Sequence, residues 1–240
     1  MKLKGKYIST TQCEYLFTKF KEHLIIIVLE VLNNYQRKKL DEGNDEEFYS
    51  EPKFVYHLDA NFRHYLSNVY KKEIADYSTI LDLMSSWDSY LPEDKKYKKV
   101  IGHGLNKQEL EKNKILDTYW IQNFNLNQEI PLENESVDCC LMVAAWQYLQ
   151  YPENLTREIV RILSNHGKII VAFSNRAFWH KAPNIWTTST EEERVKYVRK
   201  VLITNGFNEP KIIKKFNESS LNFFNFLNKD PFYCLIATKE

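Results

Sequence analysis

The segment Thr79-Ile80-Leu81-Asp82-Leu83 decides the fold class of this chain. A short apolar run of this kind is typical of a buried strand in a parallel sheet. The stretch after it, Met84-Ser85-Ser86-Trp87, is expected to lead into a helix. In open α/β sheets, ligands bind outside the carboxyl ends of the strands. Asp82 is therefore the first candidate site residue.

The alternation of strands and helices continues towards the C-terminus. Asp59 is suited to cap a helix over residues 59–72, and Asn106, Pro152 and Thr190 open three later helices. Strands are expected at 79–83, 99–102, 120–123, 137–143, 168–173, 209–214 and 232–238. No convincing helix separates the last two strands, which favours an antiparallel pair. We expect an α/β, Rossmann-like, mostly parallel seven-stranded sheet with an antiparallel C-terminal edge strand.

The first third of the chain has a different pattern. Residues 11–37 have the apolar stripe of an amphipathic helix, and the acidic run 40–48 is typical of an exposed linker. We therefore expect an N-terminal helical extension and linker over residues 1–75, followed by one domain over residues 76–240. The two N-terminal helices are expected either to cap a pocket or to cover a face of that domain.

Composition excludes several classes of protein. The net charge is +1, from 33 basic and 32 acidic residues, which gives no electrostatic reason for nucleic acid as a partner. The longest apolar run, 24–32, is far shorter than the roughly 20 residues of a membrane span. The four cysteines form no CxxC pair, so we expect reduced buried thiols, no metal site and a cytoplasmic location. No sequence feature indicates an oligomeric state.

The turn after the first strand contains no glycine. Binding a dinucleotide there requires glycines, because the backbone must approach the pyrophosphate closely. A nicotinamide-dependent oxidoreductase is therefore a weak alternative. A ligand that ends in an amino acid makes smaller demands. Asp82 could face its ammonium, and Ser85 and Ser86 could offer hydroxyls and free amides at a helix start to its carboxylate.

Four segments in order resemble the motifs of class I S-adenosylmethionine (SAM)-dependent methyltransferases of type 11. They are residues 80–83 (ILDL), 100–106 (VIGHGLN), 130–138 (IPLENESVD) and 161–168 (RILSNHGK). Residues 54–59, 85–87, 102–106, 173–179 and 230–233 are further similar to a little-characterised methyltransferase-like family of plants, algae and cyanobacteria. The resemblance implies a methyltransferase fold with SAM as cofactor.

The same resemblance implies a set of cofactor-binding residues. Two expected anchors differ from the family pattern: Gly104 replaces the acid that holds the ribose, and Asn123 replaces the acid that addresses the adenine. Asn106 or His103 would have to supply the ribose contact. The implied cofactor-binding residues are Asp82, Met84, Ser85, Ser86, Gly102, Asn106, Asn123 and Phe124.

The acceptor side is expected after the fourth and fifth strands. Methyl transfer from a sulfonium needs alignment above all, but an oxygen acceptor usually also needs a base. His180 and Tyr148 are the candidate bases. Asn175, Arg176 and Trp179 are the candidate substrate residues, and Trp146 and Trp186 could add an aromatic wall or simply pack between helices.

Two functions remain open on the sequence. The leading hypothesis is a SAM-dependent methyltransferase that acts on a small-molecule acceptor, apolar or anionic. The alternative is a methyltransferase-fold protein that has lost catalysis and serves as a binding or assembly module, because the glycines and the ribose acid are missing.

Overall fold

The computed structural model describes residues 30–216 and 230–240. Its centre is a seven-stranded sheet in the order β3-β2-β1-β4-β5-β7-β6. β1 to β5 are parallel, and β7 pairs antiparallel with both β5 and β6. The expected mostly parallel sheet with an antiparallel C-terminal strand is confirmed. β7 lies one place inside the edge, which β6 occupies.

The strands lie within a few residues of the expected positions. β5 is the most extended beyond its expectation, because its pairing with β4 begins at Leu163. The seven strands are β1 (Ser78–Asp82), β2 (Tyr97–Gly104), β3 (Thr118–Ile121), β4 (Val137–Val143), β5 (Leu163–Phe173), β6 (Lys211–Lys215) and β7 (Phe232–Thr238).

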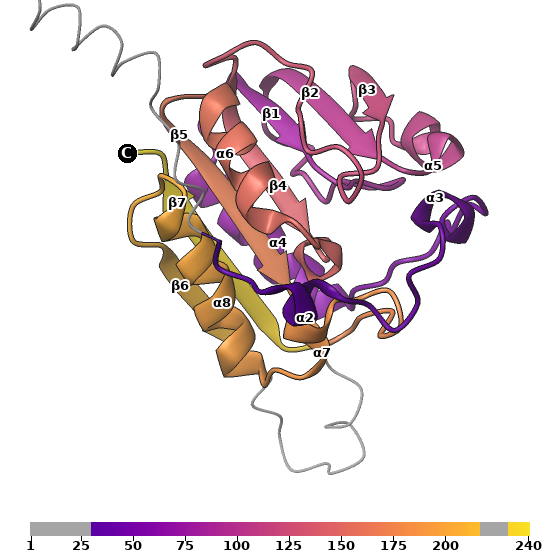
Figure 1. Ribbon diagram of the computed structural model, residues 1–240. Coiled ribbons are helices and arrows are strands. Elements are labelled where there is room, and N and C mark those ends of the chain that lie inside the picture. The colour runs from indigo at the N-terminus through magenta and orange to yellow at the C-terminus, as the bar shows by residue number, and fades with distance from the viewer. Residues whose placement is uncertain (1–29, 217–229) are drawn as a thin grey trace, which may run out of the picture.

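Helices cover both faces of the sheet (Figure 1). On one face lie α6 (Pro152–Ile162) and α8 (Glu191–Thr204), and on the other lies α4 (Ala60–Glu73). The two faces alternate along each strand: Cys140 packs with α6 and α8, whereas Cys139 packs with α4. This is the period-2 alternation that a strand imposes on neighbouring residues.

The predicted helix starts are confirmed, three of them by side-chain hydrogen bonds. The side chains of Asp59 and Asn106 accept from the third residues of α4 and of α5 (Lys107–Lys112). Thr190 and Glu193 form a capping box at α8, and Pro152 occupies the first turn of α6. Each cap satisfies backbone amides that would otherwise lack a partner.

One expected helix is absent. Residues 83–96, all described, connect β1 to β2 as a loop without any helix. The expectation that Ser85 and Ser86 stand at a helix start is therefore wrong. Asp88 caps a local turn in this loop by accepting the Tyr90 amide, and Leu91 is buried against the α4 face instead.

Residues 30–58 form an extended segment, here called the strap, that runs past the end of the sheet to which the parallel strands point (Figure 1). It contains two short helices, α2 (Asn34–Arg37) and α3 (Asp45–Phe48). The buried Glu153 of α6 holds its start by accepting from Arg37 and from the amides of Val31 and Leu32. The acidic run 40–48 is mostly exposed, as expected, but Asp45 within it is buried in an ion pair with Lys39.

The strap and α4 share their cores with the sheet. Leu32 belongs to the cluster of α6 and α8, and Leu58 belongs to the cluster of α4. The domain boundary at residue 75 stays a prediction, and most of the expected helix over residues 11–37 lies outside the described residues. No helix in the described part is long and apolar enough to cross a membrane.

Candidate active site

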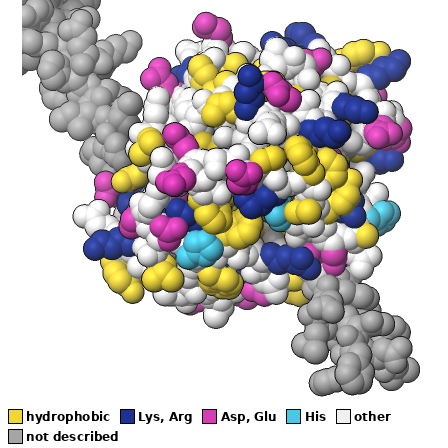
Figure 2. All heavy atoms as spheres, turned by 90° about the vertical axis from the view of Figure 1, so that its right-hand side faces the viewer, with side chains coloured by type: hydrophobic (Ala, Val, Ile, Leu, Met, Phe, Trp, Pro, Cys, Tyr) yellow, Lys and Arg dark blue, Asp and Glu magenta, His cyan; other side chains and the backbone are white. Residues whose placement is uncertain are grey.

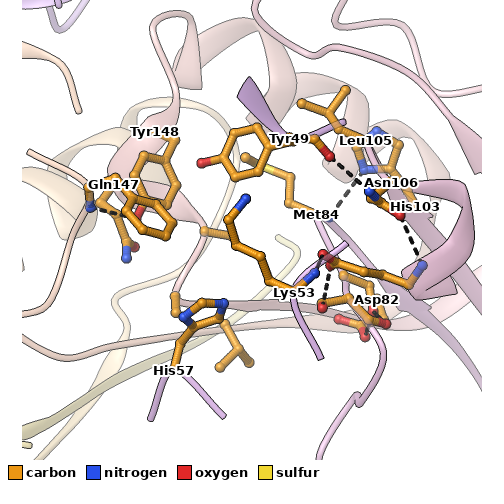
Figure 3. A pocket seen from close by; sticks show the side chains of 18 of the residues that line it. Tyr49, Lys53, His57, Asp82, Met84, His103, Leu105, Asn106, Gln147 and Tyr148 are labelled. Carbon is orange, nitrogen blue, oxygen red and sulfur yellow. Dashed lines mark hydrogen bonds between the residues drawn. The ribbon is translucent and has the colours of Figure 1, made fainter. Parts of the chain in front are cut away.

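A cavity of about 370 Å³ lies at the carboxyl ends of β1 to β5. Its position spans the boundary between β1 and β4, where the strand order of the sheet reverses, as expected for a ligand site in an open α/β fold. The strap forms one wall with Asp45, Tyr49, Lys53 and His57. Figure 3 shows Tyr49, Lys53 and His57 of the strap facing side chains of the sheet. The volume falls in the range of small-molecule sites.

Most of the predicted site residues line this cavity. They are Asp82, Met84, Ser85, Ser86, Asn106, Asn123, Phe124, Tyr148 and Arg176. Gly102, Asn175, Trp179 and His180 do not line it. The lining residues form two groups. The first half of the cavity lies at the carboxyl ends of β1 to β3, and the second half lies at the carboxyl ends of β4 and β5.

Asp82 is the buried acid of the first half. Asp82 is the last residue of β1 and is 4% exposed. Its carboxylate accepts a hydrogen bond from the Ser85 hydroxyl. Burial raises the pKa of Asp82 to about 6, although the hydroxyls of Ser85 and Ser89 counteract the shift by donating to it. A carboxylate that is this poorly compensated favours a cationic ligand group.

The loop after Asp82 has a backbone conformation that glycine usually adopts, although it contains no glycine. Met84 has a φ of +54°, in the left-handed region that most side chains avoid. Its amide donates to His103 Nδ1 at 3.1 Å, and the Ser85 amide donates to the His103 carbonyl at 2.6 Å. These two amides are therefore committed to the protein and are not free for a carboxylate.

His103 is a structural bridge. Its Nδ1 accepts from the Met84 amide, and its Nε2–H donates to the Gln122 carbonyl at 2.8 Å, which assigns the neutral tautomer. Burial lowers the pKa of His103 to about 3, so the ring stays neutral at ordinary pH. Its ring packs against that of Phe124, tilted by 31°, with 3.9 Å between ring centroids. Both nitrogens are occupied, and His103 cannot supply a ribose contact.

Two glycines of β2 serve packing. A Cβ on Gly104 would lie 2.7 Å from the Ser85 carbonyl oxygen, which explains why no acid stands at this position. A Cβ on Gly102 would lie 2.4 Å from Leu116 Cδ1. Gly102 was predicted to bind cofactor, but the space beside it is filled by Leu116.

Asn106 is also committed to internal bonds. Its Oδ1 accepts from the Glu109 amide, and its Nδ2 donates to the carbonyls of Tyr49 and Ser50 in the strap. Asn106 therefore joins α5 to the strap. Asn123 is freer, since its Oδ1 accepts from the Asn125 amide and its Nδ2 has no partner among the described residues.

Glu109 is a cavity acid that sequence reasoning missed. Its two carboxylate oxygens accept from the Ser86 hydroxyl at 2.5 Å and from the Lys53 amide at 2.6 Å. Each oxygen keeps a further lone pair for a ligand hydroxyl. Its capping position in α5 conceals this second role in the sequence.

Aromatic rings form the second half. Tyr49 and Tyr148 lie 6.4 Å apart between ring centroids, and Phe178 lies 6.2 Å from Tyr148. Tyr148 accepts from the Phe178 amide, and burial raises the pKa of its hydroxyl. A protonated phenol is a poor general base. Beside it, the buried Oε1 of Gln147 has no hydrogen-bond partner among the described residues.

Three predicted residues of this half lie elsewhere. His180 is exposed and packs its ring against Phe48, outside the cavity. Asn175 is exposed, and Trp179 is 48% exposed with the Arg194 guanidinium over its ring. The loop after Phe173 turns these side chains outward. Trp146 and Trp186 are core residues, so the aromatic wall comes from other rings.

His57 is the imidazole that does line the cavity. Burial lowers its pKa, and the nearby cations Lys53 and Arg176 add to this effect against the raising influence of Glu109. Lys53 extends across the middle of the pocket in Figure 3, between His57 and the two tyrosines. Sequence reasoning missed both residues. His57 lies in the segment 54–59, which indicated only a family likeness, and Lys53 lies in the expected N-terminal extension and linker.

Comparison with known proteins agrees with this geometry. Residues 89–171 match the family model described as "Methyltransferase domain", which is less than half of the chain. Its match runs from the loop before β2 into β5. The fold is that of the class I methyltransferases.

Solved structures share this methyltransferase fold at low sequence identity. A methyltransferase of Thermotoga maritima is 20% identical, with a TM-score of 0.53, 75% of this chain covered and 90% of that one. A Haloferax volcanii protein, solved with a methyltransferase activator, is 15% identical (TM-score 0.57, coverage 75% and 90%). Geranyl diphosphate C-methyltransferase from Streptomyces coelicolor is 12% identical (TM-score 0.51, coverage 75% and 81%). No curated protein matches the sequence.

In this chain, residues 83–96 join β1 to β2 without a helix, and Leu91 of this loop packs with α4. Within the described ranges, no group of His, Cys, Asp and Glu side chains is arranged to hold a metal ion.

Proposed function

We propose that this protein is a SAM-dependent methyltransferase that acts on a small-molecule acceptor. The observation that carries the proposal is the cavity at the reversal of strand order, with the buried Asp82 at the end of β1. The matched methyltransferase family and the methyltransferase fold support the same cofactor. One structural relative was solved with S-adenosyl-L-homocysteine bound.

The first half of the cavity fits SAM in its donors and acceptors. The carboxylate of Asp82 would hold the ammonium group, and Glu109 would accept from the ribose hydroxyls in place of the missing acid at Gly104. The Nδ2 of Asn123, which has no partner among the described residues, and the ring of Phe124 would contact the adenine. Bound SAM supplies a methyl group activated by its sulfonium.

The second half would hold the acceptor. SAM would transfer its methyl group to an acceptor oxygen or nitrogen and leave as S-adenosylhomocysteine, and the acceptor would have to lose its proton. We propose that His57 takes this proton, because it lines the cavity and its lowered pKa keeps it neutral. The strap would exclude water and align the acceptor. This role replaces the one predicted for His180.

A small acceptor suits the surroundings of the cavity. Acidic and basic side chains mix with hydrophobic ones on the face in Figure 2, without a basic stripe for nucleic acid.

Cys139, Cys140 and Cys234 are buried and unpaired, which suits a reducing cytoplasm. The motif likeness at residues 102–106 and 173–179 supports membership of the methyltransferase-like family of plants, algae and cyanobacteria.

Transfer of a labelled methyl group tests this function. The protein is incubated with methyl-labelled SAM and a deproteinised extract of metabolites, and the label is followed into small molecules. We expect transfer that depends on the protein and is lost in Asp82→Ala. SAM binding with no transfer to any fraction would favour the alternative, an inactive binding module. The amides of Met84 and Ser85 support that alternative, because they already donate to His103.

A further inference from the structure

The acceptor half of the cavity contains a cation without a carboxylate partner. Lys53 is half-buried, and none of the described carboxylates forms an ion pair with it. Its ammonium lies 5.3 Å from the ring centroid of Phe48 and 5.7 Å from that of Tyr49. Its one hydrogen bond to a described residue, the Glu51 carbonyl, is long at 3.4 Å.

The other cations of this half are neutralised. Arg176 pairs with Asp230, and Lys181 pairs with Asp41 and Asp45. Asp45 also pairs with Lys39, behind the cavity wall. With His57 neutral, Lys53 leaves this half with an excess positive charge.

The surroundings of Lys53 are aromatic. Tyr49, Tyr148 and Phe178 line the same half, and their centroids lie within 6.4 Å of each other. Attraction between opposite charges is stronger beside such weakly polar walls than in water. Aromatic walls also favour a planar or apolar body on the ligand.

We propose that the methyl acceptor is a small organic acid with an aromatic body, whose anionic group binds Lys53. The inference rests on the proposed function, because it assumes that the first half of the cavity holds the cofactor. The acceptor's nucleophile would then lie towards β1 and β4, where the methyl group is presented.

Three probes with one ring and different charge test the inference. Benzoate, benzyl alcohol and benzylamine are titrated into protein saturated with S-adenosylhomocysteine, and binding is followed by ligand-observed NMR. We expect benzoate to bind at least about tenfold more tightly than benzyl alcohol, and benzylamine to bind weakest. Lys53→Met should abolish the preference for benzoate, whereas Lys53→Arg should keep it.

The control variant is Lys98→Met, an exposed lysine near the opposite end of β2. It should behave as wild type, and all variants should bind S-adenosylhomocysteine with unchanged affinity. Equal binding of the three probes, or a benzoate preference that survives Lys53→Met, would overturn the inference alone. Failure of the wild-type protein to bind S-adenosylhomocysteine would overturn the proposed function and, with it, this inference.

Discussion

At the scale of single residues, Asp82 sets the character of the cavity. It is a buried acid with hydroxyl donors but no cation beside it in the described part of the chain, so its charged form is poorly stabilised. Such a group is unfavourable for folding and useful for binding a cationic ligand. Replacing the Asp82 carboxylate with a neutral group should therefore raise the stability of the fold and weaken cofactor binding.

Asp82→Asn should stabilise the fold in a pH-dependent way. The pKa of Asp82 rises from 3.8 in the unfolded chain to about 6 in the folded protein. Folding therefore takes up a proton between these values, and the charged carboxylate opposes folding above pH 6. The gain from Asp82→Asn should be larger at pH 7.5 than at pH 4.5, by ~2 kcal/mol. Thermal unfolding at both pH values measures this, and an equal effect at both would contradict it.

His57 should titrate below its ordinary range. Burial lowers its pKa from 6.5, and Lys53 lowers it further by its charge. NMR titration of the imidazole should find a value below 6.5 in the wild-type protein. Lys53→Met should move it upward, since a neighbouring cation is removed. An ordinary value that is insensitive to Lys53→Met would show that His57 does not share the cavity with this lysine.

At the scale of elements, the strap completes the site. Buried hydrogen bonds attach it at several points: Glu153 holds its start, and Asn106 and Glu109 hold its middle. Since the strap carries Tyr49, Lys53 and His57, these bonds set the position of the acceptor half. It is a structured wall more than a loose cover.

Arg37→Met should loosen the strap. Arg37 forms two hydrogen bonds with the buried carboxylate of Glu153, and its removal leaves that charge without its partner. Losing one partner of a buried pair costs on the order of 3 kcal/mol. Hydrogen exchange of residues 30–58 should become faster, while β4 and β5 stay protected. Lys38→Met, at an exposed neighbour, is the control, and equal exchange in both variants would refute the role of the pair.

The junction between the β1 loop and β2 depends on Gly104. Gly104→Ala would bring a methyl group within 2.7 Å of the Ser85 carbonyl oxygen, so the loop must move. We expect a loss of about 1–3 kcal/mol and weaker binding of S-adenosylhomocysteine, measured by denaturant unfolding and calorimetry. Unchanged stability and affinity would mean that the loop position is not tied to this contact.

The elements differ in how far the sequence predicts them. Strands, caps and the antiparallel ending follow from local patterns, and the structure confirms them. The helix after β1 was expected by analogy with other α/β units, but Met84 and Ser85 bond to His103 and the chain continues as a loop. Such tertiary bonds leave no periodic trace in a sequence.

At the scale of the whole molecule, the topology brings the site together. Reversal of strand order between β1 and β4 opens a crevice, and the strap returns from the N-terminal side to close one wall. The sheet half of the site could be predicted because carboxyl ends of parallel strands share an edge. The strap half could not, since Lys53 and His57 reach the cavity through contacts distant in sequence. His180 and Trp179 follow β5, the strand from which they were predicted to reach the site, but their side chains are exposed outside the cavity.

Binding of SAM tests the central claim most directly. Calorimetric titration of the folded protein with SAM and with S-adenosylhomocysteine at pH 7.5 should show one site with micromolar affinity. Asp82→Asn should weaken binding by at least about tenfold, and lowering the pH through 6 should weaken it in the wild type, because the carboxylate becomes protonated. A well-folded protein that binds neither ligand at any of these pH values would contradict the account.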